Sequence, residues 1–330
     1  MWRFVGCEAQ GRGHAKAGTP CQDKTKCLLD NDVMVIALAD GAGSARLSHF
    51  GASCVVESVS LYLTNHFDEL VSNEDGKAVK HNILDEVLKR LFILSEELEC
   101  DVNDLASTML LAAVSGTDYI IAHIGDGVIG YLDGDELKVA SEPDNGEFAN
   151  VTTFVTSKEA LFSMRLFKGK INDISGFVLM SDGTEQSLYH KTSNKLSNAL
   201  IKLMHRACLI DPDIMKAQLE YTLHTVITKN TQDDCSMAIL AKHSECLKPF
   251  DFMSFADKAA LLDMKGDMKK VKKRVRLAEK VIQIMCVPKT IKQISLELHM
   301  NPKYTKRRVD KLVTIGLAKK EGFNYTSSIH

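Results

Sequence analysis

The sequence predicts an α+β fold, a layered sandwich of sheets and helices followed by a small basic module. Three observations support this prediction. Apolar runs of strand length recur as far as Ala241, two long stretches have helical spacing, and the charge becomes strongly positive after Lys265. A length of 330 residues suffices for one core-bearing domain and a smaller module.

The composition favours a soluble globular protein, with 45% apolar and 25% charged residues. No apolar run approaches the ~20 residues that a membrane helix needs. The opening MWRFVGCEAQ lacks the order of a signal peptide, so we expect a cytoplasmic protein. Nine cysteines without a CxxC pair favour reduced thiols over a zinc ribbon or a disulfide framework.

Apolar periodicity predicts the amino-terminal elements. Trp2–Ala9 is expected to form a first strand, and Cys27–Leu29 to begin a second. Val33–Ala39 is apolar without a break, which at this length predicts a strand buried on both faces. Spacings of three and four between apolar residues predict helices over Ser48–Leu70 and Val79–Leu98.

A run of short strands is expected after these helices. Leu110–Val114, Tyr119–Ile124 and Val128–Leu132 have strand character, and Asp133-Gly134 predicts a hairpin turn into Leu137–Ala140. Two helices followed by such a meander indicate an α+β sandwich.

The rest of the first domain is predicted in less detail. Ser141–Lys170 is polar and is expected to be an irregular loop. Helices are expected at Lys195–Cys208 and Ile214–Thr228, before a last strand at Ser236–Ala241. We therefore predict a first domain of residues 1–242.

Four of the predicted strands carry an aspartate at one end. Asp40, Asp126 and Asp182 each follow an apolar run, whereas Asp233 stands just before one. A single Asp-Gly pair also fits a tight turn. A desolvated carboxylate is costly unless it meets a cation, so the repetition predicts a metal site. Carboxylates without His or Cys partners favour Mg²⁺ or Mn²⁺ over Zn²⁺.

Five ordered motifs carry a resemblance to a known family. They are TPCQD at Thr19–Asp23, ADGAGS at Ala39–Ser44, IGDG at Ile124–Gly127, MSDG at Met180–Gly183 and QDDCS at Gln232–Ser236. This order resembles the metal-dependent protein phosphatases of the 2C family, in particular the bacterial branch. The resemblance implies a four-layer α-β-β-α sandwich that hydrolyses phosphoserine and phosphothreonine, with two Mn²⁺ or Mg²⁺ ions and a third at a weaker site.

The resemblance also implies roles for single residues. Asp40 would bridge two metals and Gly41 would lend its carbonyl to one of them, because a residue without Cβ allows a close approach. Asp182 and Asp233 would complete the other shell. A metal-activated water would then attack phosphorus, with no protein nucleophile.

Two further aspartates keep alternative interpretations. By motif position, Asp126 resembles the ligand of a third metal, but it could also be a turn residue. Asp23 resembles an outer-shell carboxylate of the metal site, and its alternative is a surface or capping carboxylate.

Two positions depart from the family pattern. Ala42 stands where the eukaryotic form has a histidine proposed as general acid, and Gly18 stands nearest to an arginine that binds substrate phosphate. His14 is a candidate for phosphate binding or acid catalysis, and Arg12 and Lys16 are further candidates for the missing arginine. Ordinary surface exposure is the alternative for each, and metal-bound water is an alternative proton donor.

The carboxy-terminal part is strongly basic. From Lys265 to Lys320 the sequence has 17 Lys and Arg against 4 Asp and Glu, although the whole chain has a net charge of −2. We expect a linker and basic helix over residues 243–276 and a winged-helix module over residues 277–330. Thr290 and Asn301-Pro302 predict helix starts in that module, and a two-stranded wing should follow.

These features predict a metal-dependent serine/threonine phosphoprotein phosphatase, acting on a phosphoprotein substrate and opposing a partner kinase. The alternative is a weakly active or inactive regulatory protein of the same fold, whose winged helix binds DNA or a protein partner. A basic third helix could enter the major groove of DNA, but it could equally be a solvated face or bind protein.

Overall fold

In a computed structural model, which describes residues 1–144 and 152–329, the chain forms two compact units. The first unit comprises Met1–Met204 and Lys216–Lys242, and the second comprises His205–Met215 and His243–His330. Within the described part of the chain, no helix is both long and apolar enough to cross a lipid bilayer.

Two five-stranded antiparallel sheets form the centre of the first unit. The first sheet has the order β1 (Trp2–Ala9), β12 (Cys235–Lys242), β9 (Ile174–Met180), β6 (Val128–Asp133) and β7 (Glu136–Ser141). The second sheet has the order β2 (Lys24–Asp30), β3 (Val33–Ala39), β4 (Met109–Ser115), β5 (Asp118–Ile124) and β8 (Arg165–Lys170).

Strand β3 is buried on both faces, as its unbroken apolar run predicts. Val35 and Ala37 belong to the core between this sheet and the helices, whereas Ile36 and Leu38 belong to the core between the two sheets. All four side chains are fully buried. Because successive side chains of a strand point to opposite faces, one short run supplies both cores.

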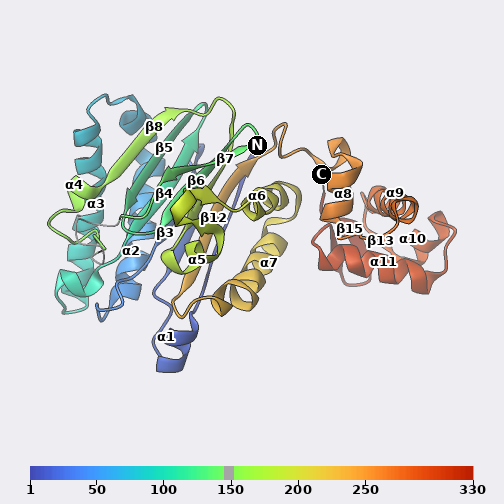
Figure 1. Cartoon of the computed structure of the whole chain (residues 1–330), viewed down its shortest axis with the longest axis horizontal. Helices are drawn as coiled ribbons and strands as arrows, with labels where there is room; N and C mark the ends of the chain where they lie inside the picture. The colour runs from blue at the N-terminus through green and yellow to red at the C-terminus, as the bar shows by residue number, and fades with distance from the viewer. Residues whose placement is uncertain (145–151, 330) are drawn as a thin grey trace. The chain divides into compact units, whose positions relative to one another are not determined.

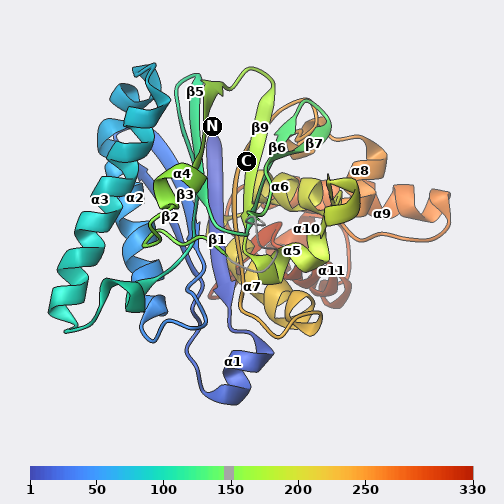
Figure 2. The ribbon, with the colours of Figure 1, turned by 60° about the vertical axis from the view of Figure 1, so that its left-hand side comes forward.

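Long helices cover the outer face of the second sheet (Figures 1 and 2). α2 (Ser48–Ser72) and α3 (Gly76–Glu97) contribute Val59 and Ile83, among others, to the core on that face. Both helices have the spacing predicted from the sequence.

Helices also lie on the outer face of the first sheet. Met204 of α6 (Ala199–Leu209) packs against Gly176 of β9, where a Cβ would lie 2.8 Å from the Met204 sulfur. α7 (Pro212–Thr225) follows α6 on the same side of the sheets (Figure 2). The four-layer α-β-β-α sandwich is therefore confirmed.

The edges of the second sheet differ from the sequence prediction. β2 begins at Lys24, three residues before the expected Cys27, and β8 lies within Ser141–Lys170, which was expected to be a loop. Edge strands have one unpaired side and need no continuous apolar run, so periodicity did not reveal them. Part of that loop prediction, residues 145–151, lies outside the described residues.

The predicted helix at Lys195–Cys208 starts later than expected. Lys195–Leu196 forms strand β11, which pairs with β10 (Tyr189–His190), and the helix begins only at Ala199. The Ser197 hydroxyl accepts a hydrogen bond from the Ala199 N–H, which favours a helix start at this point.

Short helical segments connect the larger elements. They are α1 (Arg12–Ala17), α4 (Ala160–Ser163), α5 (Asp182–Leu188) and the 3-10 turns η1 (Val102–Leu105), η2 (Lys191–Ser193), η3 (Ile227–Lys229) and η4 (Phe250–Phe252).

The second unit is mainly helical, with one small sheet of order β13-β15-β14. Its elements are α8 (Phe255–Leu261), α9 (Met268–Ile284), β13 (Lys289–Thr290), α10 (Ile291–Glu297), α11 (Pro302–Thr314), β14 (Ala318–Glu321) and β15 (Asn324–Ser327). This order of elements is the one expected of a winged-helix module, and assignment to that class stays a prediction. α9 is continuous across the expected boundary between residues 276 and 277.

Both predicted helix starts in the second unit are present. Thr290 forms a reciprocal capping box with Gln293 at the start of α10. The Asn301 side chain accepts a hydrogen bond from the Lys303 N–H at 2.9 Å, with Pro302 in the first turn of α11.

Candidate metal centre and active site

The structure brings together the aspartates that the sequence places at strand ends. Asp40 follows β3, Asp182 begins α5 directly after β9, and Asp233 lies just before β12. Burial, followed by the charges of Asp23, Asp182 and Asp233, raises the pKa of the Asp40 carboxyl well above its usual range. Residues separated by more than a hundred positions in sequence therefore form one acidic cluster.

Asp126 also belongs to this cluster. Burial, then the charges of Asp233 and Asp126, raise the pKa of Asp182 to about 6. The Thr152 hydroxyl donates a hydrogen bond to Asp126 Oδ2 at 2.5 Å, which helps to hold this carboxylate in place. The charge of Asp126 thus acts within the cluster, and its role as a metal ligand stays a prediction.

Asp23 is a buried carboxylate of the cluster, so the surface alternative for this residue is wrong. Its side chain is 0% exposed, and in the described part of the chain neither of its carboxyl oxygens has a hydrogen-bond partner of good geometry. Burial raises the pKa of Asp23 to about 7, although the nearby hydroxyls of Ser236 and Ser181 act in the opposite direction. A buried acid without strong donors is energetically costly unless a cation or a proton compensates it.

The backbone around Asp40 is held by Thr108, the residue before β4. The Asp40 N–H donates to the Thr108 hydroxyl and the Thr108 N–H donates to the Asp40 carbonyl, both at 2.8 Å. Gly41 packs against Ser48, and a Cβ at position 41 would lie 2.8 Å from the Ser48 Cβ. Close packing is thus a reason for glycine here in addition to the expected approach of its carbonyl to a metal.

The doublet Asp233-Asp234 divides its two carboxylates between different tasks. Asp234 is buried and accepts hydrogen bonds from the N–H groups of Gly11 and Gln22, each at 2.6 Å. His14 Nδ1 lies 2.9 Å from Asp234 Oδ2. The structure therefore places His14 beside Asp234, the aspartate that binds the amino-terminal motif. Asp233 belongs instead to the acidic cluster, where its charge raises the pKa of Asp40.

The residues considered as substitutes for the missing arginine have other surroundings. The Arg12 guanidinium donates to the carbonyl of Lys229 at 2.9 Å and to that of Thr231 at 3.2 Å, and Lys16 is exposed on α1. Gly18 has φ of +72° at the end of α1, a left-handed conformation in which an arginine would be strained. The helix end explains this departure from the family pattern.

Ala42, the second departure, lies in a small cluster with Ala45 and Ala106. Its N–H donates to the Ala106 carbonyl at 2.9 Å, and its side chain is buried. A histidine at position 42 would overfill this packed site unless the loop moved.

A cation near the cluster escaped the sequence analysis. Lys191 Nζ lies 2.6 Å from Glu185 Oε1, and the charges of Asp182 and Asp126 also act on Lys191. Glu185 is 1% exposed and lies one helical turn after Asp182 on α5. No sequence motif relates Glu185 to Lys191. Their side chains meet only because the chain turns from α5 into β10, which ends just before Lys191.

The chemistry of these donors fits hard divalent cations. In the described part of the chain, no three His, Cys, Asp or Glu side chains are already arranged to hold an ion. The fit therefore rests on several desolvated carboxylates whose mutual repulsion a divalent ion would relieve. Burial raises the pKa of the Cys235 thiol to about 12, so this neighbouring sulfur stays protonated and is a poor ligand.

Comparison with known proteins decides the family. The family model described as Protein phosphatase 2C matches residues 10–224, which is more than half of the chain. The chain belongs to the protein phosphatase 2C family. Serine/threonine-protein phosphatase 3 of Escherichia coli (strain K12) is 26% identical to it over 255 residues, covering 72% of this chain and 97% of that protein.

Solved structures with the same fold include two bacterial phosphatases. Serine/threonine phosphatase Stp1 from Staphylococcus aureus has a TM-score of 0.51 at 15% identity, covering 74% of this chain and 96% of that one. The S. agalactiae serine/threonine phosphatase has a TM-score of 0.50 at 16% identity, covering 74% and 100%. The chain is thus a protein phosphatase of the 2C type, a family that generally depends on Mn²⁺ or Mg²⁺.

Proposed function

We propose that this 2C phosphatase removes phosphate from phosphoserine and phosphothreonine in proteins, in a reaction that depends on Mn²⁺ or Mg²⁺. The observation that carries the proposal is that Asp40, at the end of β3, lies among Asp23, Asp182 and Asp233 from distant parts of the chain, so that desolvation and these charges raise its pKa. The name of the Escherichia coli relative, a serine/threonine-protein phosphatase, supports the same substrate class.

The proposed ligands are the residues that the family pattern and the acidic cluster share. Two ions would be held by Asp40, the Gly41 carbonyl, Asp182 and Asp233, a third by Asp126, with Asp23 in the outer shell. The chemistry that such ions would supply is charge neutralisation at phosphoryl oxygens and activation of a water as nucleophile. Cation binding would displace the protons that the buried carboxylates otherwise retain.

The protein would position these groups through its backbone. Thr108 holds both backbone groups of Asp40, and Thr152 holds the carboxylate of Asp126. Asp234 joins Gly11 and Gln22, and thereby keeps the segment before Asp23 in register with β12. The acidic side chains would thus be oriented before a substrate arrives, which is how preorganised sites lower a barrier.

Lys191 is our candidate for the cation that binds substrate phosphate in place of the missing arginine. Its ammonium is paired with the buried Glu185 and experiences the charges of Asp182 and Asp126. The Lys191 side chain is 59% exposed, so a phosphoryl group could approach it from solvent. An ammonium offers three donors to phosphate oxygens, although it lacks the bidentate geometry of arginine.

Turnover assays with matched variants test the proposed function. The purified chain should hydrolyse p-nitrophenyl phosphate and a phosphothreonine peptide when Mn²⁺ is added, and Asp40→Asn and Asp182→Asn should each abolish turnover. Asp32→Asn is a suitable control, because Asp32 is exposed with φ of +60°, a conformation that asparagine tolerates. Unchanged turnover in both cluster variants would refute the proposal.

The same assays separate this proposal from the regulatory alternative. A folded wild-type chain that binds Mn²⁺ by calorimetry but has no turnover would favour a silent phosphatase fold, consistent with Ala42 and Gly18. DNA binding by the second unit would use the exposed cations Lys303, Lys306 and Arg307 of α11. Filter binding against a salt series tests it, because phosphate contacts predict a steep loss of affinity with rising salt.

A further inference from the structure

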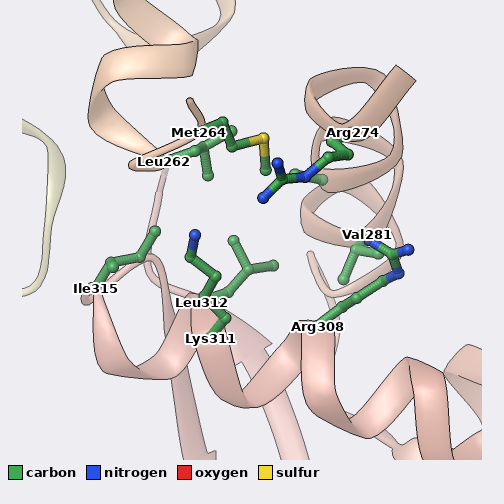
Figure 3. A pocket seen from close by; sticks show the side chains of 9 residues that line it. Leu262, Met264, Arg274, Val281, Arg308, Lys311, Leu312 and Ile315 are labelled. Atoms are coloured by element: carbon green, nitrogen blue, oxygen red, sulfur yellow. The ribbon is translucent and has the colours of Figure 1, made fainter. Parts of the chain in front are cut away.

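A small pocket lies within the second unit, between α9, α11 and the segment that follows α8 (Figure 3). Its volume is about 60 Å³, enough for the end of one side chain. The residues that line it are Leu262, Met264, Arg274, Ala278, Val281, Arg308, Lys311, Leu312 and Ile315.

The inner lining of this pocket is apolar. Val281 of α9 and Leu312 of α11 are 0% and 4% exposed, and Leu262 from the segment after α8 is 1% exposed. Ala278 adds a small buried side chain, which leaves space between the two helices. An apolar group that entered this space would be removed from water, which favours binding.

Three cations surround the same space. Arg274 comes from α9, and Arg308 and Lys311 come from α11. Figure 3 shows the guanidinium of Arg274 and the ammonium of Lys311 directed into the opening. Like charges gathered at one mouth repel each other, and this repulsion favours an anionic occupant.

The chain itself supplies little compensation for these charges. Lys311 Nζ donates to the Asp263 carbonyl at 3.2 Å, and Arg274 Nη1 donates to the Lys265 carbonyl at 3.5 Å. Among the residues that the structure describes, no carboxylate forms an ion pair with Arg274, Arg308 or Lys311. Their charges are therefore available to a ligand.

We propose that this pocket binds an acidic peptide segment of a partner protein, which inserts one apolar side chain between α9 and α11. The carboxylates that flank the inserted side chain would pair with Arg274, Arg308 and Lys311. Arginine suits such contacts, because its planar guanidinium binds a carboxylate with two parallel hydrogen bonds. Apolar anchoring combined with charge pairing around it is also the usual anatomy of a peptide site.

The buried apolar lining favours a peptide over nucleic acid. A phosphodiester backbone binds exposed cations and has no apolar group that would fill a buried recess. The exposed cations Lys303, Lys306 and Arg307 of α11 do not line the pocket, so nucleic acid would have a different surface on the same helix. Nucleic acid is therefore treated as an opposing outcome of the test.

Fluorescence anisotropy with the full chain tests the proposal. The probe is a short fluorescein-labelled peptide with one leucine flanked by glutamates, and the control probe has serine in place of leucine. We expect the leucine peptide to bind more tightly. Arg274→Gln combined with Lys311→Gln should weaken it at least about tenfold, equivalent to about 1.4 kcal/mol.

Two further variants keep the result interpretable. Lys269→Gln combined with Lys272→Gln removes the same charge from exposed positions of α9 outside the pocket, and should change affinity less than about twofold. Ala278→Leu fills the recess without removing a cation, and should abolish the preference for leucine over serine while the thermal midpoint is retained. This variant tests the apolar anchor separately from the charge.

Three outcomes would overturn the proposal. One is equal weakening by both charge-removing pairs, which would indicate general attraction between a basic surface and an acid. Another is equal affinity for the leucine and serine peptides. The third is displacement of the peptide by a random-sequence DNA duplex whose own affinity falls when Arg274→Gln and Lys311→Gln are combined.

Discussion

The carboxylate of Asp234 accepts a hydrogen bond from the backbone N–H of Gly11 at 2.6 Å, although 223 positions separate the two residues. Its other oxygen accepts one from Gln22 N–H at the same distance. A buried carboxylate thus joins the amino-terminal motif to the last strand of the sandwich. Because Asp233, its neighbour in sequence, acts within the acidic cluster, we expect mutation of Asp234 to reduce stability and mutation of Asp233 to reduce turnover.

We expect Asp234→Ala to lower the free energy of unfolding by about 3 kcal/mol. The variant would leave two buried N–H donors without acceptors, and each unsatisfied group costs about 1–3 kcal/mol. Urea denaturation followed by circular dichroism measures the loss. Asp233→Asn is the matched control, and it should abolish turnover with little loss of stability. Equal stability losses in both variants would contradict this division of tasks.

We expect Asp40→Asn to stabilise the metal-free protein while it abolishes catalysis. On folding, Asp40 must either take up a proton or carry a charge beside three other carboxylates. Asparagine avoids both costs, which we expect to be worth about 1–2 kcal/mol near neutral pH. Turnover should fall more than about a hundredfold, because Asp40 is a proposed direct ligand and loss of even an outer-shell partner costs about 10–100-fold. Thermal denaturation in a chelator and turnover with Mn²⁺ measure the two effects. A destabilised metal-free variant would mean that Asp40 has a structural role.

The stability of the metal-free protein should fall as pH rises from 4 to 8. The pKa values of Asp23 and Asp182 are raised to about 7 and about 6 in the folded protein, against 3.8 as the ordinary value. The folded state therefore holds protons that the unfolded state has released, and its advantage is lost as pH passes through these folded values. We expect a loss of at least about 1 kcal/mol, since one pKa unit corresponds to 1.36 kcal/mol.

Added Mn²⁺ should reverse most of this loss, and its stabilising effect should be larger at pH 8 than at pH 5. Metal binding near pH 6.5 should also release protons, which calorimetry in buffers of different ionisation enthalpy detects. A thermal midpoint in chelator that rises with pH over this range would contradict the proposed burial of protonated carboxylates.

We expect Lys191→Met, combined with Glu185→Gln, to raise KM for a phosphopeptide about tenfold with a smaller change in kcat. The double variant removes the ammonium without leaving the buried Glu185 carboxylate unpaired. Loss of one charge-assisted contact to phosphate costs about 1.5–3 kcal/mol, which sets the scale of this effect. Steady-state kinetics and product inhibition by inorganic phosphate measure it.

Two controls accompany this experiment. Lys191→Arg should keep most of the affinity, and Lys195→Met removes an exposed lysine of the same segment and should leave KM unchanged. If KM and phosphate inhibition match the wild type in the double variant, Lys191 is only a partner of Glu185.

Much of the fold could be predicted from the sequence, because burial leaves a periodic signature along the chain. The unbroken run Val33–Ala39 predicted a strand buried on both faces, and α2 and α3 have the predicted helical spacing. The edge strands β2 and β8 were missed in whole or in part, because a half-paired strand on a surface has no such signature.

For the candidate site too, some features could be predicted from the sequence and others depend on tertiary structure. The sequence alone determined that carboxylates stand at the ends of apolar strands, since those ends are local features of the chain. Tertiary structure decided which aspartate of the Asp233-Asp234 doublet faces the cluster, and that Lys191 meets Glu185 beside Asp182. The physical reason is that electrostatic and hydrogen-bonding partners are chosen by distance in space, which only the packing of the two sheets establishes.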